Sequence, residues 1–95
     1  MFDRIVSNLQ SLFDYSSQKA VELTSEYYLL FRDKSFCDSV GIGVQDEDYF
    51  AHEAPMGMAL RIHYYLGLKG DFDPQKFLQW RKDFLIQRRR IESGL

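Results

Sequence analysis

An all-α fold, a small bundle of about four helices, is the class that this sequence predicts. Hydrophobic side chains recur three and four positions apart through most of the chain, which is the spacing of a helix with one buried face. Aromatic residues make up 16% of the chain, and because each ring buries a large area, a core can close around few residues. The six Gly and two Pro are too few for a loop-rich chain. We therefore expect residues 1–95 to form a single helical domain.

The first predicted helix covers about residues 3–32. Asp3 can cap its start, because a carboxylate there accepts hydrogen bonds from the unpaired amides of the first turn. The apolar seam alternates steps of four and three residues: Phe2, Val6, Leu9, Phe13, Ser16, Ala20, Leu23, Tyr27 and Leu30. One long helix is the favoured interpretation. The alternative is two helices in register with a break near residues 14–17, where Asp and Ser side chains compete for backbone hydrogen bonds.

A continuous helix of this length would be longer than the rest of the domain is wide. At 1.5 Å per residue it would extend for about 45 Å, which exceeds the width of a compact domain of this size. Shorter helices placed end to end, or a second copy of the chain, would have to cover the seam. The small side chains of Ser16 and Ala20 near its middle would let another backbone approach closely. We therefore expect the chain to self-associate as a homodimer or other homo-oligomer.

Residues 33–45 are predicted to form a connector, because the helical spacing lapses there. Ser35 is placed to cap one short helical turn, and Gly41 can end that turn in a left-handed conformation. The sequence Gly41-Ile42-Gly43 is followed neither by a third Gly nor by the Lys-Ser/Thr of a phosphate-binding loop. We interpret it as a turn.

Two helices are predicted in the middle of the chain, over about residues 46–53 and 55–68. Acidic residues at 46–48 suit the positive end of a helix dipole, and Pro55 separates the two helices. One face of the second helix should be buried: Met58, Ala59, Ile62, Tyr65 and Leu66. Tyr64 should face outward beside Arg61. The connector from Lys69 to Phe72 is short, so we expect this helix and the last one to be antiparallel neighbours.

The last helix is predicted over residues 74–92, where Asp73 offers a cap and Pro74 fits the first turn. Six apolar side chains fall on one arc of about 160°: Phe77, Leu78, Trp80, Phe84, Leu85 and Ile91. Arg81 and Arg88 project into that same arc. Because an unpaired buried guanidinium is costly, each needs a carboxylate, a carbonyl or solvent.

The charges divide the chain into blocks of opposite sign. Residues 46–73 carry a net charge of -4 and residues 74–95 carry +4. We expect the arginines of the last helix to pair with the acidic segment of the same chain, namely with Asp46, Glu47, Asp48 or Glu53. The alternative is that they remain open in a groove beside Trp80 and Phe84, where they would bind an anionic ligand or an acidic partner.

Catalytic and metal-binding groups are sparse. Asp48 and His52 lie four residues apart on one predicted helical face and are weak metal candidates, which Glu47, Glu53 or His63 could complete. The chain lacks the Glu-x-x-His repeat of helical di-metal bundles. Cys37 has no neighbouring catalytic motif and is expected to be a buried thiol. We therefore predict no enzyme activity and no cofactor.

A non-catalytic protein-binding role, as a regulatory or adaptor module that also self-associates, is the favoured function. Aromatic and Arg side chains dominate interface energies, and the expected contact residues are Tyr64, Trp80, Arg81, Phe84, Arg88, Arg89 and Arg90. Nucleic-acid binding by the basic last helix is the alternative, although three consecutive arginines point in different directions on a helix and the net charge is -2. A small metal- or cofactor-binding protein is the second alternative. A single Cys and the lack of a long apolar run predict a cytoplasmic protein outside membranes.

Overall fold

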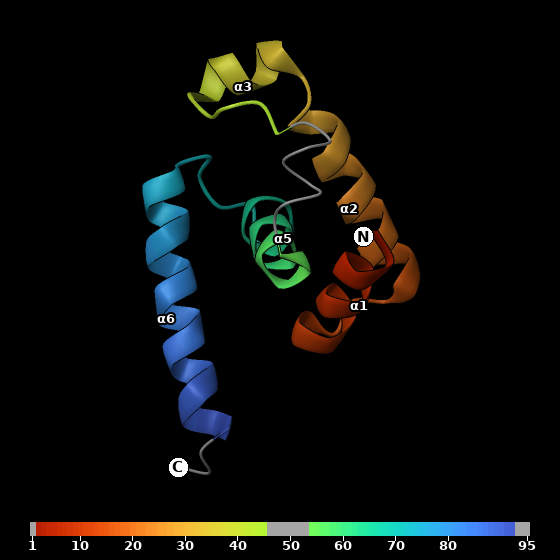
Figure 1. Ribbon diagram of the computed structural model, residues 1–95, viewed down its shortest axis with the longest axis vertical. Coiled ribbons are helices and arrows are strands. Elements are labelled where there is room, and N and C mark those ends of the chain that lie inside the picture. Colours follow the sequence, from red (N-terminus) through yellow and green to blue (C-terminus); the bar gives the residue numbers. More distant parts are fainter. Residues whose placement is uncertain (1, 46–53, 93–95) are drawn as a thin grey trace.

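The computed structural model describes residues 2–45 and 54–92, and the regular elements in these ranges are helices. They are α1 (Phe2–Phe13), α2 (Ser17–Leu30), α3 (Lys34–Val40), α5 (Pro55–Ile62), the π-helical turn η1 (His63–Gly67) and α6 (Pro74–Glu92). Figure 1 shows α5 in the centre, with α1 and α2 on one side of it and α6 on the other. The predicted all-α bundle is confirmed, while the helix predicted over 46–53 lies outside the described residues.

The predicted continuous helix over 3–32 is wrong, because the chain breaks between α1 and α2. Asp14 adopts a left-handed conformation with φ of 59°, which Asp tolerates better than most residues. The Ser16 hydroxyl then accepts a hydrogen bond from the Lys19 amide at 3.1 Å and caps α2. The break falls within residues 14–17, where Asp and Ser side chains compete for backbone hydrogen bonds. Since α1 and α2 pack against each other, the apolar seam folds back on itself and no overhanging helix is left.

The core lies where α5 packs against α1 and α2. Its fully buried side chains come from each of these helices and from the chain that follows α2: Ile5, Leu9, Ala20, Tyr27, Phe31, Cys37, Met58, Ala59 and Ile62. The rings of Tyr27 and Phe31 stack with centroids 4.2 Å apart. The buried Thr24 hydroxyl donates to the Ala20 carbonyl at 2.8 Å, so it is satisfied within its own helix.

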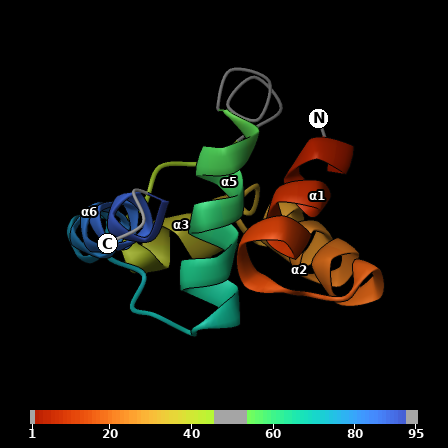
Figure 2. The ribbon, with the colours of Figure 1, turned by 90° about the horizontal axis from the view of Figure 1, so that it is seen from below.

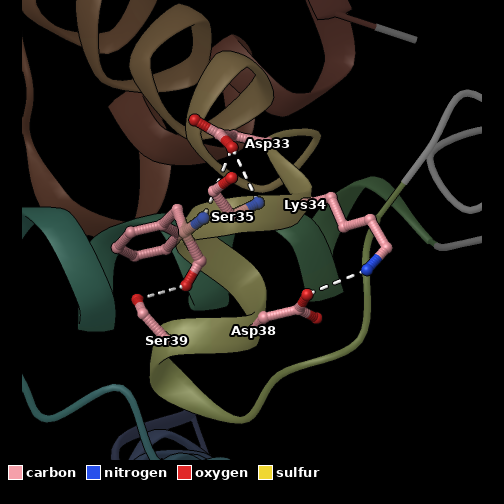
Figure 3. A network of polar contacts seen from close by, with 6 residues as sticks. Asp33, Lys34, Ser35, Asp38 and Ser39 are labelled. Carbon is pink, nitrogen blue, oxygen red and sulfur yellow. Dashed lines mark hydrogen bonds and ion pairs between the residues drawn. The ribbon is translucent and has the colours of Figure 1, made fainter.

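The short helix α3 lies in the predicted connector and is capped at both ends (Figure 3). The Asp33 carboxylate accepts hydrogen bonds from the Ser35 amide at 2.9 Å and the Phe36 amide at 3.3 Å, so Asp33 rather than the expected Ser35 is the N-cap. Gly41 ends the helix with φ of 72°, the left-handed conformation predicted for it. The helix buries Cys37, whose thiol donates to the Phe31 carbonyl at 3.4 Å.

Helix α5 begins at Pro55 and continues into η1, so the region predicted as one helix over 55–68 is helical through Gly67. The predicted inward face is confirmed for four residues that are buried: Met58, Ala59, Ile62 and Tyr65. The outward placement of Tyr64 is wrong. Its ring packs against Phe77 and Trp80 of α6, with centroids 5.7 and 5.4 Å away.

Helix α6 covers the predicted residues but crosses α5 instead of lying antiparallel to it. Figure 1 shows α6 along its length and α5 nearly end-on, and Figure 2 shows the reverse. The physical reason is that α6 packs against two separate parts of the protein. Near its start Phe77 packs on Tyr65 of η1, and two turns later Phe84 packs on Phe13 at the end of α1. A helix that contacts both points lies across the central helix.

A buried polar contact ties the segment after α3 to α2 and yields a stability prediction. The Tyr27 hydroxyl donates to the Gln45 side-chain oxygen at 2.5 Å, and the Gln45 amide donates to the Phe31 carbonyl at 2.7 Å. Tyr27→Phe would leave the Gln45 oxygen buried without that donor, and we expect a loss of about 1–3 kcal/mol of unfolding free energy. Urea denaturation measures this loss. Tyr28→Phe is the matched control, because the Tyr28 hydroxyl meets the exposed Arg32 instead, and its cost should be under about 0.5 kcal/mol.

Candidate protein-binding surface

The inward face of α6 consists of three aromatic side chains that attach it to the rest of the protein. Phe77 is buried, and Trp80 and Phe84 are half-buried. The Trp80 ring lies 5.4 Å from Phe84 and 6.5 Å from Phe13, between centroids. The predicted contact residues Trp80 and Phe84, like Tyr64, are therefore packed into the protein and are not exposed anchors.

A second face of α6 is exposed and apolar. Leu78, Leu85 and Ile86 have 41%, 40% and 43% of their surface accessible. The prediction placed Leu78 and Leu85 on the buried arc, and the structure corrects this. The aromatic residues occupy one side of that arc against the protein, whereas the two leucines lie at its outer edge, about 80–100° of rotation from Phe77.

Cations border these exposed aliphatic side chains. Together they line a shallow surface hollow of about 500 Å³, formed by Leu78, Arg81, Lys82, Leu85, Ile86 and Arg89. We call these six residues the α6 surface. Lys82 and Arg89 are exposed, and the half-buried Arg81 guanidinium lies 5.8 Å from the centre of the Phe77 ring. Among the described residues, no carboxylate lies within salt-bridge distance of these three cations.

Two neighbouring hollows extend the α6 surface at either end. One, of about 430 Å³, shares Leu78 and reaches Ile42 and Arg61. The other, of about 260 Å³, shares Leu85 and Arg89 with the α6 surface and is also lined by Met56 and Arg88. The three hollows therefore neighbour one another along α6, between the segment after α3 and the first turn of α5.

The other predicted site residues are placed as follows. Arg88 is half-buried beside Met56, and Arg90 is exposed and lines none of these hollows. The acidic counterpart predicted for the arginines, Asp46, Glu47, Asp48 and Glu53, lies outside the described residues, so that pairing stays a prediction. Ile86 was not predicted as a contact residue, and Lys82 was considered only for the alternative, nucleic-acid binding, where it shares a side of the helix with Arg89. A second stripe with helical spacing, Leu78, Lys82, Leu85 and Arg89, was the signal that could have identified this face.

A half-buried polar contact lies among the rings around His63. Its ring stacks on Phe13 with centroids 3.6 Å apart, and its Nδ1 lies 2.7 Å from the Tyr15 hydroxyl, to which it is hydrogen-bonded. Burial lowers the pKa of His63 and raises the pKa of Tyr15. A Cβ at Gly67 would overlap the Tyr15 hydroxyl, so the absence of a side chain there makes room for this contact. The pair holds the α1–α2 break against η1.

Chemistry at the remaining candidate groups is limited. The Cys37 thiol is buried, as predicted, and burial raises its pKa, which disfavours the reactive thiolate. Within residues 2–45 and 54–92, no group of three or more His, Cys, Asp or Glu side chains is arranged to hold a metal ion. The weak metal candidates Asp48 and His52 lie outside these ranges.

Comparison with protein-family models, with curated proteins and with solved structures gave no match to this chain. In the described part of the chain, none of the helices is both long and apolar enough to cross a bilayer.

The lowered pKa of His63 predicts that acid destabilises the fold. The unfolded chain, with a His pKa near 6.5, binds the proton more readily than the folded chain, so the unfolding free energy should fall as the pH drops below about 6.5. Urea denaturation between pH 7.5 and 5 measures this dependence. His63→Gln removes the titrating group, so its unfolding free energy should fall less over the same range, while any contribution of His52 is common to both proteins. Equal pH dependence in the two would contradict the prediction.

Proposed function

We propose that this chain is a non-catalytic protein-binding module of the cytoplasm and that its α6 surface binds an amphipathic helix with acidic side chains. One observation carries the proposal: three exposed aliphatic side chains of α6 lie among three cations. Exposed apolar area bordered by charge is typical of a surface that binds another protein.

The spacing of the apolar groups favours a helical ligand. Leu78 and Leu85 lie seven residues apart, or about 10.5 Å along the helix axis. This is the repeat with which a second helix presents its own side chains at positions i and i+7. The hollows along α6 supply the depressions into which such side chains would pack.

The charges favour an acidic ligand. Arg81, Lys82 and Arg89 border the aliphatic row, and Asp83, the acid of the same helix segment, is held away from it by a hydrogen bond from Gln79 at 3.1 Å. Carboxylates flanking the apolar side chains of a ligand would meet these cations at the rim, where they raise the association rate and exclude basic competitors.

Nucleic-acid binding is less well supported by this geometry. Stacking on unpaired bases requires exposed rings among the cations, but the α6 surface offers aliphatic side chains and Trp80 packs against Phe13 and Phe84. The three consecutive arginines also do not share one face, since Arg88 and Arg89 line the hollow near Met56 and Arg90 does not.

Charge reversal on the α6 surface tests the proposal. The probe is a fluorescent helical peptide with Leu at two-turn spacing and Glu at the flanking positions, and fluorescence anisotropy measures its Kd. Lys82→Glu/Arg89→Glu should weaken binding at least tenfold, because both attractive contacts become repulsive, and Leu78→Ala/Leu85→Ala should do so through lost apolar burial. These changes lie at exposed side chains, so thermal unfolding should move little.

The matched control is Arg4→Glu/Lys69→Glu, which makes the same change in net charge at exposed residues outside the α6 surface. It should keep the wild-type Kd. A peptide with Lys in place of Glu should not bind. The proposal would be contradicted if the surface variant and the control bound the peptide equally well. It would also be contradicted if a single-stranded oligonucleotide bound more tightly than the acidic peptide.

A further inference from the structure

Helix α2 presents a face whose chemistry complements the α6 surface. Its inward side chains, including Ala20, Leu23 and Tyr27, are buried against the core. On the opposite side Val21 and Leu29 keep 45% and 68% of their surface exposed. The exposed carboxylates of Glu22 and Glu26 lie between them in the sequence. We call these four residues the α2 surface.

The two surfaces match in spacing and in charge. Val21 and Leu29 are eight residues apart, as are Leu78 and Ile86, so both pairs span about 12 Å along a helix. Glu22 and Glu26 lie between the two apolar residues of α2 in the sequence, and the cations Arg81, Lys82 and Arg89 lie among and beyond those of α6. The α2 surface is thus an exposed segment of the kind proposed above as the ligand of α6: it is helical and acidic, and it carries two apolar side chains, here eight residues apart instead of seven.

The two surfaces of one molecule cannot meet each other. Figures 1 and 2 both show α2 and α6 on opposite sides of the protein with α5 between them. All of the α6 surface except the half-buried Arg81 is exposed, and the residues of the α2 surface are exposed on α2, whose buried residues face the core. An α2 surface that docks on α6 therefore has to come from another molecule.

We propose that the occupant of the α6 surface is the α2 surface of a second copy of this chain. This inference rests on the proposed function and names the partner. Because the contact joins two different surfaces, each bound copy keeps one of them unoccupied. With the surfaces on opposite sides of the molecule, further copies add at both ends, and the assembly grows head to tail instead of closing as a two-fold dimer.

Two carboxylates that follow α2 in the chain are already engaged within α3. Asp33 caps α3, and Asp38 pairs with Lys34 at 2.9 Å. Arg32, in the turn after α2, donates to the Tyr28 hydroxyl at 2.9 Å. Lys19 is an exposed cation one turn before Glu22 and opposes the proposed attraction. Lys19→Glu should therefore strengthen the association.

Complementary charge reversal in two separate molecules tests the inference. The first variant, Lys82→Glu/Arg89→Glu, has an acidic α6 surface, and the second, Glu22→Lys/Glu26→Lys, has a basic α2 surface. Sedimentation velocity over a wide concentration range measures the mass. The wild type should grow beyond two copies as concentration rises, and each variant alone should associate at least tenfold more weakly. An equimolar mixture of the two should recover wild-type growth, because every contact then joins opposite charges.

The outcomes separate this inference from the proposed function. Recovery in the mixture, together with stronger association of Lys19→Glu, supports head-to-tail contact between α2 and α6. A mixture that stays monomeric, a wild type that remains monomeric, or one that stops at two copies would overturn it. In each of those three cases, binding of the acidic peptide decides whether the proposed function also fails. If the peptide binds the wild type and does not bind the first variant, the proposed function stands and only the inference fails. If that peptide also fails to bind, both fail. Circular dichroism and urea denaturation of each variant verify that the exposed substitutions leave the fold intact.

Discussion

The packing of Phe13 against His63 is the contact on which the arrangement of the helices depends. It brings the end of α1 onto η1, with ring centroids 3.6 Å apart, and α6 then packs across both through Trp80 and Phe84. The contact requires the chain to break immediately after Phe13, because a continuous helix would carry residues 14–30 away from the core. The Tyr15 hydroxyl, placed by that break, holds the other side of the imidazole. A local competition for backbone hydrogen bonds thus decides the position of the last helix.

Attachment of α6 through one row of rings leaves its opposite side exposed. Phe77, Trp80 and Phe84 recur at steps of three and four residues and use a single face. A surface helix with only that apolar stripe would carry polar side chains on the rest of its circumference. Here Leu78, Leu85 and Ile86 form an additional apolar stripe that keeps 41%, 40% and 43% of its residues' surface exposed. Because that exposed area contributes little to folding, the positions are available for selection by a binding partner.

Helix ends could be predicted from the sequence because they depend on local chemistry. The contacts between helices could not be predicted, because they depend on long-range packing. Asp73-Pro74 and Gly41 act within one turn of the chain, so the start of α6 and the end of α3 follow from sequence alone. Tyr64 was misplaced because its burial depends on where α6 crosses. The spacing of apolar residues within the helix that carries Tyr64 gives no information about that crossing point. Leu78 and Leu85 were misplaced because hydrophobic periodicity counts apolar residues without showing which stripe the core uses. The basic character of the site, through Arg81 and Arg89, was predictable, but its apolar floor was not.

The grounds for self-association also change once the helix break is known. A long helix with an uncovered seam would favour a symmetric dimer around that seam, yet its residues Leu9, Ala20, Leu23 and Tyr27 are buried in the core that α1, α2 and α5 form. The exposed complementary faces instead lie on opposite sides of the molecule, and they favour open growth. If an unrelated acidic helix binds the same α6 surface, it blocks addition of the next α2 surface and ends the assembly there. Binding of such a partner and self-assembly are then competing uses of one surface, and the free partner concentration sets the length of the assembly.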